Sequence, residues 1–259
     1  MNAPVTVSIV GNVGIIELSR PEKLNCLSLE VHEQIAAARA RFEADPSVRA
    51  ILIRAQGKHF CTGADLTEVK GKLYDAQALD HFLAFGMDGL RKLEQSPLPV
   101  IVAVQGLCLA GGIELMLSAD VCFAAQSAQF GDQHAQFGLI PGWGGSQRLT
   151  RIMGQRRALD LMLSARWLTA DEAKEAGLVN YVTADDGLHA AALEYCQKIA
   201  TRSRPGIAEM KRLAREGIEL TLDQAMQLER DAARRALPSA DVAEGLDAFE
   251  NRRAPDFKQ

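Results

Sequence analysis

The residues best suited to chemistry by type and spacing lie in two glycine turns, each of which follows a run typical of a strand. These turns are GKHFCTGADLTEV (57–69) and VAVQGLCLAGGIELMLSADV (102–121). In the second, the pair Gly111 and Gly112 directly precedes a helical pattern. The first N–H groups of a helix have no internal partner and carry partial positive charge, and glycine lets another group approach the backbone closely. An oxygen that becomes negative during a reaction suits such a site.

Two titratable residues accompany these turns. Glu114 falls three residues after Gly111, in the first turn of the predicted helix. An acid there also complements the helix dipole, so the residues alone leave a catalytic and a purely structural role open. His134 lies in the turn-rich run FGDQHAQFGLIPGWGG (130–145), either as a catalytic group or as a polar loop residue. Neither turn has the phosphate-loop pattern, and no GxGxxG follows a strand, so these nucleotide-binding loops are not predicted.

The elements that must position these residues alternate between strands and helices in the first half of the chain. Alternating apolar and polar residues around Gly11 and Asn12 predict a hairpin, and Ser28 is typical of a helix cap. A layered α/β core with largely buried strands follows from this alternation. The predicted strands are RAILIRA (49–55), PLPVIVAVQG (97–106) and ADVCFAA (119–125), and the clearest predicted helix is AQALDHFLAFGMDGLRKLEQS (76–96).

After about residue 145 the pattern is helical almost throughout. TADEAKEAGLV (169–179) opens with a capping-box pattern from Thr169 to Glu172, and TLDQAMQLERDAARRAL (221–237) is strongly helical. GLVNYV (177–182) is the one strand predicted in this half. No low-complexity linker separates the halves, so we expect the helical region to pack on the core as a subdomain.

Composition narrows the class of protein. The 259 residues carry a formal net charge of −4, which argues against broad binding to nucleic acid or to acidic membranes. No apolar run approaches the ~20 residues of a membrane span, and we expect no signal peptide. The five cysteines are widely spaced without a CxxC pair. They predict reduced thiols, a cytoplasmic location and no zinc site.

Five stretches in series resemble the enoyl-CoA hydratase/isomerase family, also called the crotonase superfamily. The resemblance covers essentially the whole chain and implies a crotonase-like ββα spiral core over 1–195. The remaining residues, 196–259, would form a C-terminal helical region for trimerisation. The matching stretches are SRPEKLNCLS (19–28), FCTGADLTEV (60–69), VQGLCLAGGIELMLSADV (104–121), FGDQHAQFGLIPGWGGSQRL (130–149) and LTADEAKEAGLVNYV (168–182).

The resemblance implies an acyl-CoA substrate and an enolate-like anion bound by two backbone N–H groups, with no metal and no redox cofactor. Carried onto this chain, the two donors are Ala64 and Gly111. Two fixed donors in a dry site stabilise the developing charge without reorganising. The first of the two glutamates that hydratases use falls on Glu114, which would take the proton from the water that adds at Cβ.

The second glutamate position falls on His134, so the chain departs from the two-glutamate pattern. His134 either replaces the acid, since an unperturbed imidazole has a pKa of ~6.5, or binds a polar acyl group while Glu114 handles both protons. A third alternative is other acyl-CoA chemistry, namely isomerisation, decarboxylation or C–C hydrolysis. A loop histidine without a role is the fourth. Asp132 is a further candidate acid, because residues 132 and 134 of an extended segment point to the same side.

The resemblance also implies the binding residues. The CoA moiety would contact Lys23, Leu24 and Asn25, and the segment from Ala64 through Asp65, Leu66 and Thr67 would line the pantetheine path. Lys23 could instead be a solvated surface charge. Trp143 stands where many relatives have a small residue, and it would narrow the acyl site, stack on an aromatic acyl group or simply pack in the core. Across the interface of a trimer or hexamer, the candidates for CoA contact are Phe249 and Lys258.

The reaction predicted from these residues is hydration or dehydration at the Cα–Cβ bond of an acyl-CoA thioester. Retained Glu114 favours hydration over isomerisation, because family isomerases rely on a carboxylate at the second position. The alternative from a different class is a non-catalytic acyl-CoA-binding protein, which the retained Glu114 and the small residues Ala64 and Gly111 disfavour. An RNA-binding role is disfavoured by the net charge and by the lack of a basic-aromatic stripe.

Overall fold

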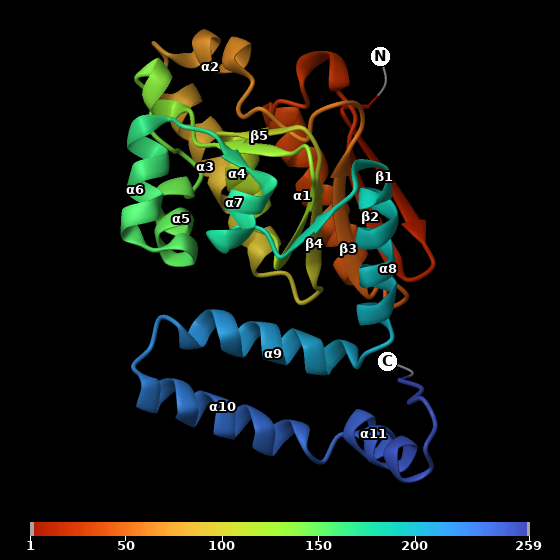
Figure 1. Ribbon diagram of the computed structural model, residues 1–259. Helices are drawn as coiled ribbons and strands as arrows, with labels where there is room; N and C mark the ends of the chain where they lie inside the picture. Colours follow the sequence, from red (N-terminus) through yellow and green to blue (C-terminus); the bar gives the residue numbers. More distant parts are fainter. Residues whose placement is uncertain (1–2, 258–259) are drawn as a thin grey trace.

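A six-stranded sheet forms the centre of the computed structural model, which describes residues 3–257. The strands follow the order β1-β2-β3-β4-β6-β9, and all neighbours pair in parallel except β1 and β2. Figure 1 shows this sheet in the upper body of the molecule. Its strands are β1 (Val5–Val10), β2 (Val13–Leu18), β3 (Ala50–Ala55), β4 (Val100–Val104), β6 (Val121–Ala125) and β9 (Tyr181–Thr183).

The predicted hairpin and the predicted helix cap are confirmed. β1 and β2 are joined by the two-residue turn at Gly11 and Asn12, where Gly11 takes the left-handed φ of 58° that favours glycine. The Ser28 side chain accepts a hydrogen bond from the backbone N–H of Val31 and so caps helix α1 (Leu29–Ala44). The hairpin and this cap place α1 over the first strands of the sheet.

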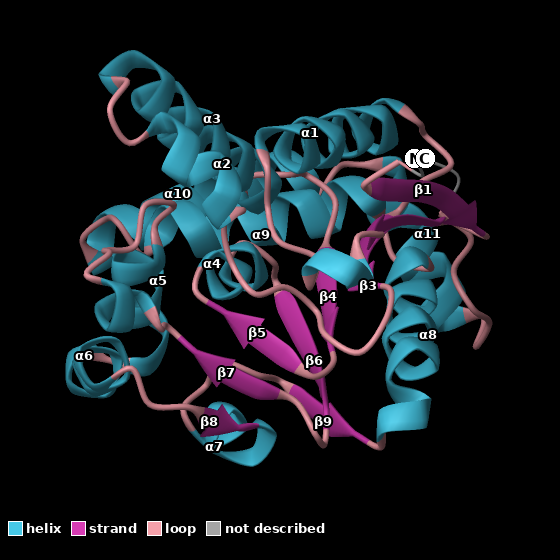
Figure 2. Cartoon of the chain, turned by 90° about the horizontal axis from the view of Figure 1, so that it is seen from above, coloured by secondary structure: helices cyan, strands magenta, loops and turns pink. Residues whose placement is uncertain are grey.

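Helices cover both faces of the large sheet. Helix α1 packs on β1 and β2, while α8 (Leu188–Ala200) packs on β2, β3, β4 and β6. Helix α3 (Ala76–Glu94) lies against α1, as Figure 2 shows from above. The strands enclosed between these layers are almost completely buried, which confirms the layered α/β core that their continuous apolar runs predict.

A second, smaller sheet carries the turns that matter for function. It consists of β5 (Leu107–Leu109), β7 (Gln129–Gly131) and β8 (Leu168–Thr169), and helix α4 (Gly111–Leu117) begins two residues after β5. The second half of the chain therefore holds two short strands, β8 and β9, rather than the single strand predicted over 177–182, and only 181–182 of that stretch are extended. The capping box from Thr169 to Glu172 is confirmed.

The remaining elements are short helices around the core and three helices beyond it. The latter run below the core in Figure 1. The domain boundary predicted after residue 195 falls inside α8, which packs on the sheet, so the chain leaves the core only after that helix. These elements are η1 (Pro21–Lys23), α2 (Leu66–Lys72), η2 (His134–Phe137), α5 (Gly145–Met153), α6 (Gln155–Ser164), α7 (Ala170–Glu175), η3 (Asp185–Gly187), α9 (Arg204–Gly217), α10 (Leu222–Ala236) and α11 (Ala240–Glu250).

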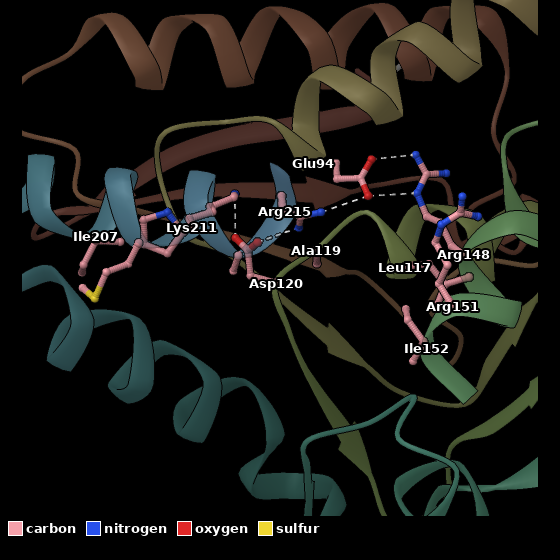
Figure 3. Close-up of a pocket in the computed structure, with 13 residues that line it drawn as sticks. Glu94, Leu117, Ala119, Asp120, Arg148, Arg151, Ile152, Ile207, Lys211 and Arg215 are labelled. Carbon is pink, nitrogen blue, oxygen red and sulfur yellow. Dashed lines mark hydrogen bonds and ion pairs between the residues drawn. The ribbon is translucent and has the colours of Figure 1, made fainter. Parts of the chain in front are cut away.

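An ionic network fastens α9 to the core. Lys211 Nζ lies 2.6 Å from one carboxylate oxygen of Asp120, and Arg215 contacts the other at 2.7 Å. Arg215 also contacts Glu94 of α3 at 2.9 Å, and Arg148 of α5 contacts the same carboxylate at 3.1 Å (Figure 3). Removing one member of a partly buried pair leaves its partner's charge uncompensated, so the network fixes the position of α9.

All five cysteines are unpaired, as predicted. Cys61, Cys108, Cys122 and Cys196 are buried, and burial raises the pKa of the Cys61 thiol to about 12, so the side chain is an apolar filler rather than a nucleophile. Within residues 3–257, no helix is long and apolar enough to cross a membrane, and no three metal-ligating side chains are grouped to hold an ion.

Candidate active site

The two predicted anion donors, Ala64 and Gly111, lie next to each other although they are distant in sequence. The backbones of Cys61 and Cys108 form an isolated parallel β-bridge, and the Leu109 N–H donates to the Cys61 carbonyl at 2.9 Å. A Cβ atom added to Gly111 would lie 3.2 Å from the Ala64 nitrogen. Neither amide donates to an acceptor within residues 3–257, so two neighbouring N–H groups are free for an anionic oxygen.

A strained residue sets the direction of the Gly111 amide. Ala110 has φ 47° and ψ −116°, a combination that costs a residue with a side chain about 1–3 kcal/mol. Its N–H donates to the Gly131 carbonyl at 3.0 Å, which ties the turn to the neighbouring strand. The next residues must be glycine, since a Cβ on Gly112 would lie 2.2 Å from the Cys61 carbonyl oxygen. The turn therefore holds its strained conformation at the point where α4 begins.

Glu114 projects from the first turn of α4 with only 2% of its surface exposed. Its Oε1 accepts hydrogen bonds from the backbone N–H groups of Trp143 at 2.7 Å and Gly145 at 2.8 Å. Its Oε2 accepts none from the described residues. Burial raises the pKa of Glu114, and the negative charge of Asp132 raises it further. The two backbone hydrogen bonds and the charge of His134 lower it. Burial prevails, so the pKa of Glu114 lies above its ordinary value of 4.5. One oxygen is thus anchored and the other is free to act as a base.

Asp132 and His134 form a pair beside Glu114. The Asp132 Oδ1 lies 2.9 Å from His134 Nδ1 and accepts the His134 backbone N–H at 3.3 Å. Burial alone would lower the pKa of His134, but the hydrogen bond and charge of Asp132 and the charge of Glu114 outweigh it. The pKa of His134 is therefore raised above 6.5, which favours the protonated form of the imidazole.

The side chains of Asp132 and His134 lie on the same side, as predicted, but the prediction that residues 132–134 are extended is wrong. Strand β7 ends at Gly131, Gln133 adopts a left-handed φ of 60°, and η2 begins at His134. An Asp side chain that accepts a hydrogen bond from the backbone N–H two residues later stabilises a turn, and this local hydrogen bond competes with the extended geometry of a strand. The turn, rather than strand alternation, brings Asp132 and His134 together.

The predicted CoA-contacting segment lies beside the first anion donor. Lys23 ends η1, Leu24 and Asn25 follow with left-handed φ values of 52° and 54°, and the Leu24 carbonyl accepts the Thr62 N–H at 3.2 Å. The Asn25 side chain is buried. It accepts the Arg20 N–H at 2.9 Å and donates to two backbone carbonyls. The Asn25 N–H also donates to the Arg20 carbonyl at 2.9 Å, so any polar contact of CoA with Asn25 would have to be made by its backbone carbonyl.

The predicted pantetheine-lining segment forms the start of α2. Asp65 caps this helix by accepting the Thr67 N–H at 3.1 Å, and it contacts Arg20 at 2.9 Å. Burial would raise the pKa of Asp65, but the bonds to Arg20 and other donors lower it, so the carboxylate is charged and already paired. Leu66 and Thr67 are exposed. The Asp65 N–H donates to the Leu27 carbonyl at 2.8 Å, and the Asp65 carbonyl accepts the Val69 N–H at 3.0 Å. In this segment the Ala64 N–H and the side chains of Leu66 and Thr67 therefore stay free to contact a ligand.

Trp143 is buried against the anion site. Its indole contacts the rings of His32 and Phe82, and a Cβ on Gly111 would lie 2.7 Å from the indole Cζ3. Burial lowers the pKa of His32 to about 4, so this ring is neutral. The sequence did not predict that the backbone N–H groups of Trp143 and Gly145 anchor the Glu114 carboxylate. The glycine-rich PGWGG is the only signal in the sequence, because a Cβ added to Gly145 would lie only 3.2 Å from Oε1.

The C-terminal candidates do not join this site within one chain. Phe249 lies on α11, 82% exposed, and Figure 1 shows α11 at the far end of the molecule from α2. Lys258 lies outside the described residues. The structure thus brings together Lys23 to Asn25, Ala64 to Thr67, Gly111 and Glu114 with the pair Asp132 and His134, and places Trp143 behind them.

Comparison with known proteins identifies the family of this chain. Residues 8–259 match the enoyl-CoA hydratase/isomerase family. A protein of Rhizobium meliloti described as a probable enoyl-CoA hydratase is 38% identical over 97% of this chain and 96% of its own length. A mitochondrial enoyl-CoA hydratase of Pongo abelii is 34% identical over 95% of this chain and 83% of its own length.

A solved structure extends the comparison to the fold. The crystal structure of an enoyl-CoA hydratase from Bacillus anthracis superposes with a TM-score of 0.94 over 98% of this chain and 99% of that one, at 34% identity. The relatives also include a 1,2-epoxyphenylacetyl-CoA isomerase of Escherichia coli, 34% identical over 93% of each chain. With its crotonase α/β fold of two sheets and C-terminal helices, this chain belongs to the enoyl-CoA hydratase/isomerase family.

Proposed function

We propose that this chain is an enoyl-CoA hydratase, which adds water across the Cα–Cβ bond of an acyl-CoA thioester or removes it. One observation carries the proposal: the free N–H groups of Ala64 and Gly111 occur in the same site as the Glu114 carboxylate. The Oε1 of this carboxylate is hydrogen-bonded and its Oε2 is free. Anion donors and a base are what this addition requires. The relatives described as hydratases support the same reaction.

Water addition would begin with the thioester oxygen on the two backbone donors. Oε2 of Glu114 takes a proton from water as the water oxygen bonds to Cβ. The electron pair of the double bond moves to the thioester oxygen as an enolate, and each fixed N–H donor stabilises that charge by about 3 kcal/mol in comparable sites. Anchoring of Oε1 at 2.7 and 2.8 Å keeps the base in one orientation, so the approach of water needs no rearrangement.

The second proton would come from His134. As the enolate collapses, Cα takes the proton from the imidazolium, which becomes neutral. The proton that Glu114 has gained then returns to the imidazole, directly or through water, and the site is restored. The raised pKa of His134 supports this role, because the donor must be charged when substrate binds.

A direct test is to mix the protein with crotonyl-CoA and follow the ultraviolet absorbance of the conjugated thioester. Hydration lowers this absorbance and yields a product heavier by one water in mass spectrometry. Loss of carbon dioxide or cleavage of a C–C bond from other acyl-CoA esters would reveal other chemistry, and isomerisation would leave the mass unchanged but shift the chromatographic retention. Binding of several acyl-CoA esters without turnover would favour the non-catalytic alternative and contradict the proposal.

We further propose that Lys23, Leu24, the Ala64 backbone and the side chains of Leu66 and Thr67 contact CoA.

We also propose that residues 196–259 mediate assembly into trimers or hexamers. Large apolar side chains on the C-terminal helices are exposed in the single chain, among them Ile218, Leu222 and Phe249 at 71, 74 and 82%. Exposed apolar surface of this kind marks association sites. Sedimentation velocity should give three or six times the chain mass of 28.1 kDa, and a monomer would contradict this expectation.

Trp143 is expected to limit the size of the acyl group. Its indole fills the space beside Gly111, so Trp143→Ala should open room for longer chains next to the reacting carbons. We expect the preference in kcat/KM for crotonyl-CoA over trans-2-decenoyl-CoA to fall by about tenfold or more, since methylene discrimination of 1–3 kcal/mol is typical of such pockets. Steady-state kinetics with a series of chain lengths measures this change.

The matched control is Trp167→Ala, which removes the other tryptophan, 40% exposed on the loop before β8. It should leave the chain-length preference unchanged. Trp143→Phe serves as a milder variant, because emptying a buried tryptophan site costs about 3–5 kcal/mol of stability. An equal loss of kcat/KM at every chain length in both Trp143 variants would assign the residue to packing alone.

A further inference from the structure

Asp132 is a buried carboxylate for which the proposed reaction gives no role. Only 2% of its surface is exposed, and it has no cationic partner among the described residues other than His134. A charged carboxylate is costly to bury unless its oxygens are paired or hydrogen-bonded. The two hydrogen bonds that Asp132 accepts from His134 therefore help to offset the cost of burying its carboxylate.

The contact fixes the role of each ring nitrogen of His134. An ionised carboxylate only accepts hydrogen bonds, so at 2.9 Å from the Asp132 Oδ1 the His134 Nδ1 must be the donor. The ring then has Nε2 left for any other partner. A carboxylate on one ring nitrogen also holds the plane of the imidazole, as happens for metal-bound and catalytic histidines.

The backbone ties this pair to the anion donors. Asp132 directly follows Gly131, which is the last residue of β7, pairs with Leu109 of β5 and accepts the Ala110 N–H. Ala110 in turn precedes the donor Gly111. Gln133, between the two paired residues, is anchored by a side-chain hydrogen bond to the Ala165 carbonyl. The pair and the Gly111 donor therefore follow directly after the ends of two adjacent strands, β7 and β5, of one small sheet.

The charged groups that face His134 are Asp132, in the same turn, and Glu114 from α4. When both carboxylates are ionised, a protonated His134 leaves this three-residue cluster with a net charge of −1. Loss of that proton would leave two carboxylates with no compensating cation. The two carboxylates therefore favour the charged form of His134, which is the form that can give a proton to a substrate.

We propose that Asp132 is a positioning residue, which holds Nδ1 of His134 so that Nε2 is the proton donor to the substrate Cα. This inference rests on the proposed hydration. Asp132 and His134 then act as one unit in the place of a second glutamate. Asp132 itself exchanges no proton with the substrate.

The first test observes His134 without any substrate. In protein with carbon-13-labelled histidine rings, the His134 resonance is identified by its loss in His134→Ala and is titrated by NMR. Asp132→Asn keeps an acceptor oxygen but removes the charge, so we expect the His134 titration midpoint to fall by about one pH unit or more. His189 on α8 serves as the internal control and should not move. An unchanged His134 midpoint overturns the proposal.

The second test is kinetic. Asp132→Asn should lower kcat by about 10- to 100-fold, as loss of a residue that orients a functional histidine typically does, with little change in KM. The alkaline limb of its pH–rate profile should shift to lower pH with the NMR midpoint. In a His134→Ala background, Asp132→Asn should have no further effect on kcat.

Two kinetic outcomes would overturn the proposal. A second, equal loss of kcat in the double variant would make Asp132 a direct proton donor. A fall in stability and a rise in KM with the alkaline limb unmoved would make it merely structural. Failure of the proposed function is separate: a wild-type protein that leaves crotonyl-CoA unhydrated refutes hydration, while the NMR titration still decides whether Asp132 controls His134.

Discussion

Glu114→Gln should lower kcat for hydration of crotonyl-CoA by about 10³-fold, because general-base catalysis by a positioned side chain contributes 10²–10⁴-fold. Glutamine cannot take a proton from water. The loss should appear in kcat rather than in KM, since the base acts in the transition state and not in holding the CoA ester. Initial rates followed by the absorbance of the conjugated thioester measure both constants.

The substitution isolates the base because of how the carboxylate is held. A glutamine oxygen can still accept the N–H groups of Trp143 and Gly145 at the place of Oε1. The anion donors and the loop 142–145 should therefore keep their positions, and the thermal midpoint should match or exceed that of the wild type, because a buried charge is removed. Near-normal turnover in a folded Glu114→Gln variant would refute the assignment of Glu114 as the base.

The sequence was sufficient for elements whose signals are local. The turn at Gly11 and Asn12, the cap at Ser28 and the capping box at Thr169 all appear where predicted, because each depends on bonds within a few residues. The proximity of Ala64 and Gly111 rested instead on the resemblance to a family. No local pattern could show that a β-bridge between the backbones of Cys61 and Cys108 holds the two glycine turns together.

What escaped prediction depends on contacts made across the chain. Nothing near Glu114 indicates that backbone N–H groups about 30 residues later anchor its carboxylate. The left-handed Gln133 breaks an otherwise extended run, and its anchor is the carbonyl of Ala165, 32 residues away. The motif predicts that Asn25 contacts a ligand, but its side-chain amide makes three hydrogen bonds within the chain. Side-chain identity shows which chemistry is available, while the tertiary partners decide which atoms stay free.

His134→Ala should lower kcat by about 10²-fold and remove the alkaline limb of the pH–rate profile. The sign follows from the roles: Glu114 must be ionised, so the rate rises as pH increases through its pKa, above 4.5. His134 must be protonated, so the rate falls as pH increases through its pKa, above 6.5. The wild-type profile should therefore be bell-shaped. Without the imidazole only the acidic limb remains, shifted upward because the nearby positive charge no longer lowers the pKa of Glu114.

The matched control is His189→Ala, which makes the same substitution at another half-buried histidine, on α8. It should keep both limbs and a normal kcat. An alkaline limb that persists in His134→Ala together with a lowered kcat would show that another group donates the proton to Cα, and Asp132, buried beside it, would be the first to examine. A profile and kcat identical to those of the wild type would return His134 to the role of a loop residue, and Glu114 would then handle both proton transfers. Loss of the alkaline limb identifies the first outcome by the shape of the profile, and the value of kcat distinguishes the other two, so one pH series on two variants separates all three.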